Sequence, residues 1–283
     1  MVVESLENPE NAEKNPKHMF LFGVLYTSIA ILISLWVFPE QASLVMIFLT
    51  VMGIFPLFYK TIKYEESKDM QDYEERLLLK EHSRALSFFM YFFIGSTISY
   101  ALWYVFLPSN IVQSLFSTQV TTILQINGGV TGFSVQVFEV FGKIFFNNVR
   151  VLIFCLIFAF LYGFGAIFVL TWNASVIGAA IGNFIRTNLS NVSSFFGVQS
   201  VFLYFKTISI GMLKYSIHGI PEILAYFVAG LAGGIISVAI IKHDFRTKNF
   251  EKIILDSSDL IIISVLLLLV AAALEVFVTP LFF

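Results

Sequence analysis

Six long apolar runs constrain the fold of this chain more than any other feature. Each has between 15 and 23 residues without a charged side chain: 19–38, 42–59, 85–107, 151–172, 223–241 and 260–274. About 20 such residues are enough for a helix to cross the hydrocarbon core of a bilayer. Because lipid cannot hydrogen-bond to backbone groups, helices are the structure that these runs favour. The sequence therefore predicts an all-α, polytopic membrane protein.

The composition supports this class. Only 13% of the residues are charged, whereas a soluble domain carries about 25%. The net charge of −2 offers no basic surface for nucleic acid, so the expected partner of the surface is the lipid bilayer. Cys155 is the single cysteine, which excludes an intramolecular disulfide and a cysteine-based metal site.

The positive charges predict the orientation of the spans. Six Lys or Arg residues lie in 60–84 and four in 242–258, but only Lys143 lies in 108–147. Loops rich in Lys and Arg stay in the cytoplasm. Placing both basic loops there requires a further crossing between 172 and 222, so the short apolar run 173–186 is predicted to be a seventh span. We expect a multi-pass plasma membrane protein with a cytoplasmic N-terminus.

Three stretches between the spans are predicted to form other helices. Apolar residues mix with charged ones in 133–146 and 195–214, which is typical of one or two extracytoplasmic interfacial helices. Packing against other spans is the alternative. The alternating charges of 60–84 predict a solvated cytoplasmic helix. We divide the chain into an N-terminal membrane part, 1–130, with three spans and this charged helix, and a membrane core, 131–283.

The segment 217–222 places ionisable residues at the mouth of a span. Pro221 suits the first turn of a helix, and Glu222 would lie in that turn, where the helix dipole favours a negative charge. His218 lies beside them. The structural interpretation is a helix start. The functional interpretation is a polar site at membrane depth, where ionisable groups are costly unless they are paired or hydrated.

Asparagine residues mark two further predicted helix starts. Asn147 and Asn148 precede Arg150, and Asn173 follows the fourth apolar run. Asparagine is a favourable N-cap. The predicted topology puts Asn147 and Asn148 on the same side as His218 and Glu222. Arg150 would then be a partner for Glu222, and the amides would be partners for His218.

No catalytic, cofactor or metal residues are predicted. One His and one Glu four residues apart are a poor zinc site, since a catalytic zinc takes three protein ligands. The sequence shows no phosphate loop, dinucleotide fingerprint or nucleophile motif.

Small residues recur at helix-packing intervals, which lets helix backbones approach closely in lipid. These candidate packing residues are Gly163, Gly165, Gly178, Gly182, Ala229 and Gly233. The pattern predicts one compact core of three spans. It is compatible with contacts within one chain or between subunits.

Two segments resemble the stage II sporulation protein M (SpoIIM) family: NNVRVLIFCLIFAFLYGFGAIFVLTWNASVIGAAIG at 147–182 and HGIPEILAYFVAGLAGG at 218–234. The residues that match the family pattern are Asn147, Asn148, Asn173, His218, Gly219 and Glu222. Ala174 stands where the family usually has Gly, and Ile217 where it has Pro. The resemblance covers residues 135–283. It implies a non-catalytic membrane component like the family's namesake, which belongs to a sporulation engulfment machine containing cell-wall hydrolases.

Three functional hypotheses follow. The first is a non-enzymatic membrane scaffold or assembly component, acting as a homo-oligomer such as a dimer or with other membrane or envelope proteins. The second is a transporter or channel whose outer vestibule is lined by Asn147, Asn148, His218 and Glu222. The third is an intramembrane hydrolase with Glu222 as base and His218 as metal ligand or acid. We favour the first because catalytic motifs are missing and small-residue faces are present.

Overall fold

A computed structural model describes residues 16–69, 75–128, 137–162, 165–192, 198–241 and 247–282 of the chain. These residues are almost entirely helical, with short turns between helices, and they include no strand. The helices in chain order are α2 (Lys17–Val37), α3 (Ala42–Asp69), α4 (Glu75–Phe106), α5 (Ser109–Leu115), α6 (Ser117–Gly128), α7 (Val137–Tyr162), α8 (Gly165–Val192), α9 (Val198–Ile241), α10 (Lys248–Ala273), the π-helix η1 (Leu274–Val278) and α11 (Thr279–Phe282).

Seven of the described helical segments are long and apolar enough to cross a membrane. They lie in α2, α3, α4, α7, α8, α9 and the continuous α10–η1–α11 segment. The predictions of an all-α fold and of about seven spans are confirmed, and the chain is a multi-pass membrane protein. The span that the charge pattern required between 172 and 222 lies in α8.

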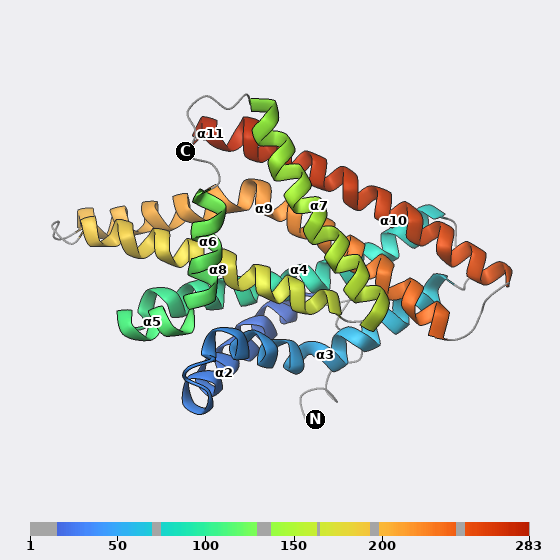
Figure 1. The fold of residues 1–283 in the computed structure, drawn as a ribbon, viewed down its shortest axis with the longest axis horizontal. Coiled ribbons are helices and arrows are strands. Elements are labelled where there is room, and N and C mark those ends of the chain that lie inside the picture. The colour runs from blue at the N-terminus through green and yellow to red at the C-terminus, as the bar shows by residue number, and fades with distance from the viewer. Residues whose placement is uncertain are drawn as a thin grey trace.

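Helix α9 is the centre of the bundle. In the most apolar part of its span, 83% of the residues are buried inside the protein. The corresponding share is 22% for the spans in α7 and in α10. Figure 1 shows α8 lying beside α9, with α7 crossing α9 obliquely and α10 on the outside. The joined ends of α8 and α9 project beyond the other helices. One apolar core draws on helices of both predicted parts of the chain, from Met19 to Leu268; the division near residue 130 stays a prediction.

The predicted boundary between the fourth and fifth spans is wrong. We placed it at residues 172 and 173, but α7 ends at Tyr162 and α8 begins at Gly165. Two glycines flank Phe164 in the sequence, and glycine favours turns over helix. The cap assigned to Asn173 is wrong for the same reason, because this residue lies inside α8. Its amide Nδ2 instead donates a hydrogen bond to the Val169 carbonyl oxygen at 2.8 Å.

The mixed apolar and charged stretches do not form separate helices where the structure describes them. Residues 137–146 are the first part of α7, and 198–214 are the first part of α9. In α7, Lys143 pairs with Glu139 one turn earlier at 2.9 Å, which supports continuation of the helix. The charged segment 60–84 does not form a separate helix either. Its first residues belong to α3, which ends at Asp69, and its last residues belong to α4, which begins at Glu75.

Glycines bring the spans into close contact. A methyl group placed on Gly178 or Gly182 of α8 would lie 2.6 Å from the Cβ atom of Tyr100 or Tyr104 in α4. The glycine pair of α8 therefore packs against α4, a helix outside the three-span core that we expected. Gly23 in α2 and Gly95 in α4 also lie directly against each other's helix backbones, a contact that the sequence analysis missed.

The other predicted packing residues lie nearer to α9. A methyl group on Gly233 of α9 would lie 3.0 Å from Ala159 Cβ in α7. Ala229 is fully buried. Gly165 is the first residue of α8, and Gly163 lies outside the described residues.

A buried polar network fixes the short helix α6 to two spans. Ser43 at the start of α3 donates a hydrogen bond to Gln119 Oε1 at 2.9 Å. The Gln119 amide donates back to the Ser43 carbonyl oxygen and to Ser175 Oγ of α8, both at 3.2 Å. Every polar atom of the Gln119 amide group thus has a partner, as burial requires.

Candidate functional site

The candidate site lies where α9 meets the end of α10 and its π-helical continuation. In α9, His218 and Glu222 are one turn apart, as the sequence spacing required. Both side chains are half-buried. They lie near one end of the span Tyr215–Ile241, so the two ionisable groups are within a membrane-spanning segment rather than in a loop.

The start that we predicted at Gly219–Glu222 is not a helix start. Helix α9 begins at Val198, and Pro221 lies in its interior. Proline removes one backbone hydrogen bond there. Transmembrane helices tolerate this because neighbouring groups satisfy the freed carbonyl. The interpretation of Glu222 as a first-turn residue stabilised by the helix dipole is therefore wrong.

Each of the two α9 residues has a polar neighbour. The Tyr226 hydroxyl donates a hydrogen bond to Glu222 Oε1 at 2.8 Å. His218 Nδ1 lies 3.3 Å from Thr279 Oγ1 in α11. Glu275 in η1 is close enough to Glu222 for the two carboxylates to interact electrostatically. The structure thus adds Tyr226, Glu275 and Thr279 to the residues expected at this place.

The π-helix η1 contains Glu275 and directly precedes Thr279. Pro280 follows in α11, and a proline ring clashes with the carbonyl group four residues earlier in a regular helix. The Thr279 hydroxyl donates to the Leu274 carbonyl oxygen five residues earlier at 3.1 Å. Such π turns are rare and occur often at functional sites.

Asn147 and Asn148 do not cap a helix, because both lie inside α7. Asn147 is exposed, while Asn148 is only 6% exposed. The Asn148 side chain lies on the face of α7 shared by Leu152 and Cys155, and Cys155 is close enough to Tyr226 for an electrostatic interaction. About two turns before Asn148, the ring of Phe141 contacts that of Phe277 in η1. Asn148 therefore lies between two points where α7 meets the candidate site.

The Asn148 amide has no hydrogen-bond partner for its Nδ2 atom among the described residues. Buried donors of this kind are uncommon and costly. Arg150 is exposed on α7, and within the described parts of the chain no ion pair joins it to Glu222. The partnership predicted for Arg150 is therefore not present.

Comparison of the sequence with models of protein families identifies the family of this chain. The model of the family described as stage II sporulation protein M (SpoIIM) matches residues 85–280. The chain belongs to the SpoIIM family. No curated protein and no solved structure matches it.

The match to the SpoIIM family covers every residue of the candidate site, from Asn147 to Thr279. It begins inside α4, upstream of the region in which the sequence motifs were evident. The match therefore also includes Tyr100 and Tyr104, the residues of α4 that pack against Gly178 and Gly182.

The chemistry available at the site of this SpoIIM-family chain is that of two carboxylates, an imidazole, a phenol and a hydroxyl. Across the residues that the structure describes, no group of three or more His, Cys, Asp or Glu side chains converges to hold a metal ion. The carboxyl groups of Glu222 and Glu275 are available to a cation or proton, and His218 and Thr279 can hold α9 and α11 together.

A second buried polar pair lies in the N-terminal half of the chain. His82 Nδ1 of α4 is 2.7 Å from Glu65 Oε2 of α3, with side chains 2% and 0% exposed. This pair was not predicted, because both residues lie in the charged segment 60–84 that was expected to be solvated. It joins α3 to α4 next to their connection.

Proposed function

We propose that this SpoIIM-family chain is a non-catalytic membrane scaffold, an assembly component that acts through a homo-oligomer or a complex with other membrane or envelope proteins. We place it in the plasma membrane, with its N-terminus in the cytoplasm, because the Lys- and Arg-rich segments 60–84 and 242–258 would then lie on that side. The observation that carries the proposal is the position of Arg150 on the exposed face of the α7 span.

Arg150 lies in the middle of the span Val137–Phe160, on its exposed side. Around it on the helix surface lie the exposed side chains of Phe146, Asn147, Ile153, Phe154 and Ile157. A charged side chain that faces lipid is costly and usually pairs with another polar group. The described residues supply no ion pair for Arg150, and we propose that its partner group belongs to another protein or to a second copy of this chain.

The surroundings of Arg150 also favour protein as its partner. The spans of α7 and α10 are each only 22% buried. Their exposed faces carry aromatic and aliphatic side chains that can pack against further helices. We therefore expect a membrane helix with an acidic side chain to cover Arg150.

The test is the assembly state of the full chain extracted from membranes in polymer nanodiscs, measured by native mass spectrometry. We expect the wild type as a complex, and Arg150→Leu with at least a fivefold smaller assembled fraction. Lys143→Leu is the matched control, since Lys143 is also exposed on α7 but already pairs with Glu139; it should leave assembly unchanged.

A monodisperse wild-type monomer without protein partners would refute the scaffold. An Arg150→Leu variant that loses co-purifying anionic lipid and keeps its assembly would refute the role of Arg150 in assembly, because it would mean that Arg150 binds only lipid phosphate.

The second candidate function is transport of a cation or proton, which the proximity of Glu222 to Glu275 favours. It predicts uptake in proteoliposomes that falls at least tenfold in both Glu222→Gln and Glu275→Gln. Glu251→Gln is the control, because Glu251 is an exposed residue in the first turn of α10. Uptake that is equal in wild type and both variants would exclude this candidate.

A further inference from the structure

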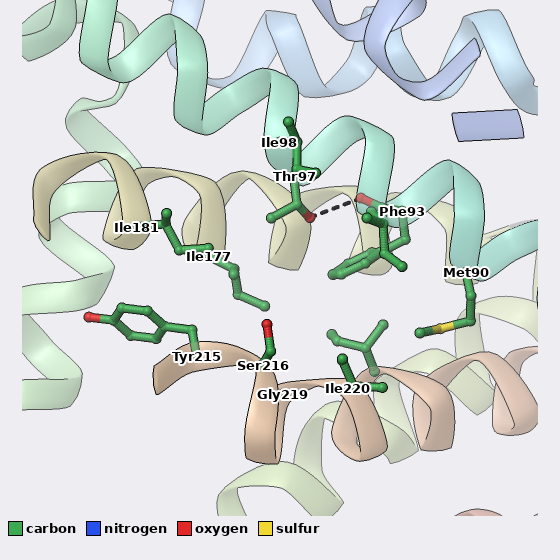
Figure 2. Close-up of a pocket in the computed structure, with 12 residues that line it drawn as sticks. Met90, Phe93, Thr97, Ile98, Ile177, Ile181, Tyr215, Ser216, Gly219 and Ile220 are labelled. Carbon is green, nitrogen blue, oxygen red and sulfur yellow. Dashed lines mark hydrogen bonds between the residues drawn. The ribbon is translucent and has the colours of Figure 1, made fainter. Parts of the chain in front are cut away.

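A cavity of about 130 Å³ lies between α4, α8 and α9, on the side of α9 where Gly219 faces α4 and α8. Figure 2 shows Phe93 and Thr97 of α4, Ile177 and Ile181 of α8, and Ser216 and Gly219 of α9 around it. All these residues belong to membrane spans. The Thr97 hydroxyl is already bonded to the Phe93 carbonyl oxygen at 2.9 Å, so the lining is predominantly hydrocarbon.

Gly219 indicates that the sequence of α9 leaves this space open. A methyl group added to Gly178, Gly182, Gly230 or Gly233 would meet another atom at 3.0 Å or less, so close packing accounts for those glycines. A methyl group on Gly219 would meet nothing within 4 Å, although Gly219 is buried. Glycine weakens a helix relative to alanine, and no contact among the described residues requires it here.

An apolar space of this size is favourable only when it is filled. Side chains that line a void lose dispersion contacts on that side. Water does not compensate, because apolar cavities stay dry; one of about 150 Å³ in an engineered lysozyme binds benzene instead. The cavity described here therefore has room for a short length of hydrocarbon chain.

The surroundings of the cavity identify the source of that hydrocarbon. Two of its lining residues, Ile94 of α4 and Ile220 of α9, are exposed on the membrane-facing surface. They mark where the cavity meets the bilayer. We propose that the cavity is a lipid site, in which an acyl chain of a membrane phospholipid enters sideways between α4 and α9 and packs against Gly219.

This site goes beyond the scaffold function and does not depend on it. The test uses the purified full chain in vesicles of phosphatidylcholine and phosphatidylglycerol. A small fraction of a phospholipid with a diazirine group near the end of one acyl chain is the probe. After illumination, the labelled residues are mapped by mass spectrometry. We expect adducts on Ile181 and Ile223, which line the cavity and are only 8% and 2% exposed.

A variant that fills the cavity should remove this labelling. Gly219→Leu should lower the adducts at Ile181 and Ile223 at least fivefold, while labelling of the exposed Leu266 in α10 stays constant. Gly142→Leu is the matched control: Gly142 is also helical with no atom near an added methyl group, but it does not line the cavity. If Gly219→Leu fails to fold, Ile177→Phe fills the same space from α8.

Two outcomes would overturn the lipid site. The first is labelling of Ile181 and Ile223 at the background level in the wild type, as expected if the cavity is empty or is filled by a protein side chain. The second is unchanged labelling of these residues in a folded Gly219→Leu or Ile177→Phe variant.

Discussion

The guanidinium group of Arg186 in α8 donates a hydrogen bond to the carbonyl oxygen of Leu107, just after the end of α4, at 3.2 Å. The same side chain donates to the Tyr104 carbonyl oxygen at 3.3 Å and to Ser109 Oγ at 2.7 Å. The last carbonyl groups of a helix have no partner within the helix and carry partial negative charge. Arg186 therefore caps α4 and fixes its end to α8 and to the start of α5.

We expect Arg186→Gln to lower the free energy of unfolding by about 1–2 kcal/mol, because the carbonyl groups at the end of α4 lose a charged donor. Unfolding by SDS titration of the protein in detergent micelles measures this. Lys143→Gln is the comparison, since an exposed ion pair one turn apart contributes at most about 0.5 kcal/mol. Equal stabilities for the two variants would argue against the cap.

Gly178→Ala should destabilise the protein by about 1–3 kcal/mol, because the added methyl group overlaps Tyr100 Cβ and the Thr97 carbonyl oxygen of α4. Gly142→Ala adds the same group where no atom lies within 4 Å. Alanine favours helix over glycine by about 1 kcal/mol, so the control should be neutral or stabilising. Thermal unfolding in nanodiscs compares the two, and a neutral Gly178→Ala would contradict the close contact of α8 with α4.

Removing one member of the buried Glu65–His82 pair should be costly. We expect Glu65→Ala to destabilise the protein by about 3–5 kcal/mol, because His82 is left in an apolar place without its carboxylate. Replacing both residues by leucine should recover most of this loss, since apolar pairs substitute well for buried polar pairs. SDS-induced unfolding of the single and double variants measures the difference; a double variant as unstable as Glu65→Ala would show that the pair does not act as a unit.

Tyr226→Phe and Glu222→Gln test whether the two residues stabilise the candidate site jointly. Each should lower the free energy of unfolding by about 1–2 kcal/mol, because a buried hydrogen bond is lost or weakened. Residues in direct contact give coupling energies of at least about 0.5 kcal/mol in a double-mutant cycle. Strictly additive effects would mean that the hydrogen bond of 2.8 Å contributes nothing to stability.

The number of spans was predictable because hydrophobic length and the distribution of Lys and Arg are properties of the chain itself. The short run 173–186 was too polar to be identified by hydropathy alone, but the basic segments on either side of it required a crossing. Membership of the SpoIIM family was predictable from a few polar residues within apolar segments, including Asn148 and His218.

Helix ends were less predictable, because polar residues behave differently inside membrane helices. Asn173 forms a hydrogen bond with the backbone of its own helix, so it can lie in a helix interior rather than at a cap. Pro221 lies in the interior of α9, which membrane helices tolerate because neighbouring groups satisfy the carbonyl that it leaves free. In both cases residue types that end helices in water proved compatible with long, continuous helices.

The neighbours of His218 were not predictable from local patterns. Thr279 is 61 residues away in the sequence, and its position depends on the π turn before Pro280. The contact between Gly23 and Gly95 was missed for a similar reason, because each span contains a glycine without a nearby repeat. A lone charge in a span, such as Glu275, was the one available signal of a functional position.

The length of α9 has a mechanical consequence. Its 44 residues correspond to about 66 Å, whereas the hydrocarbon core of a bilayer is about 30 Å thick. The first 17 residues, 198–214, precede the span Tyr215–Ile241 and give the helix a lever arm of about 25 Å. This arm is helical without interruption up to His218. A sideways force on its tip would therefore act as a torque on the centre of the bundle, where Gly233 contacts α7.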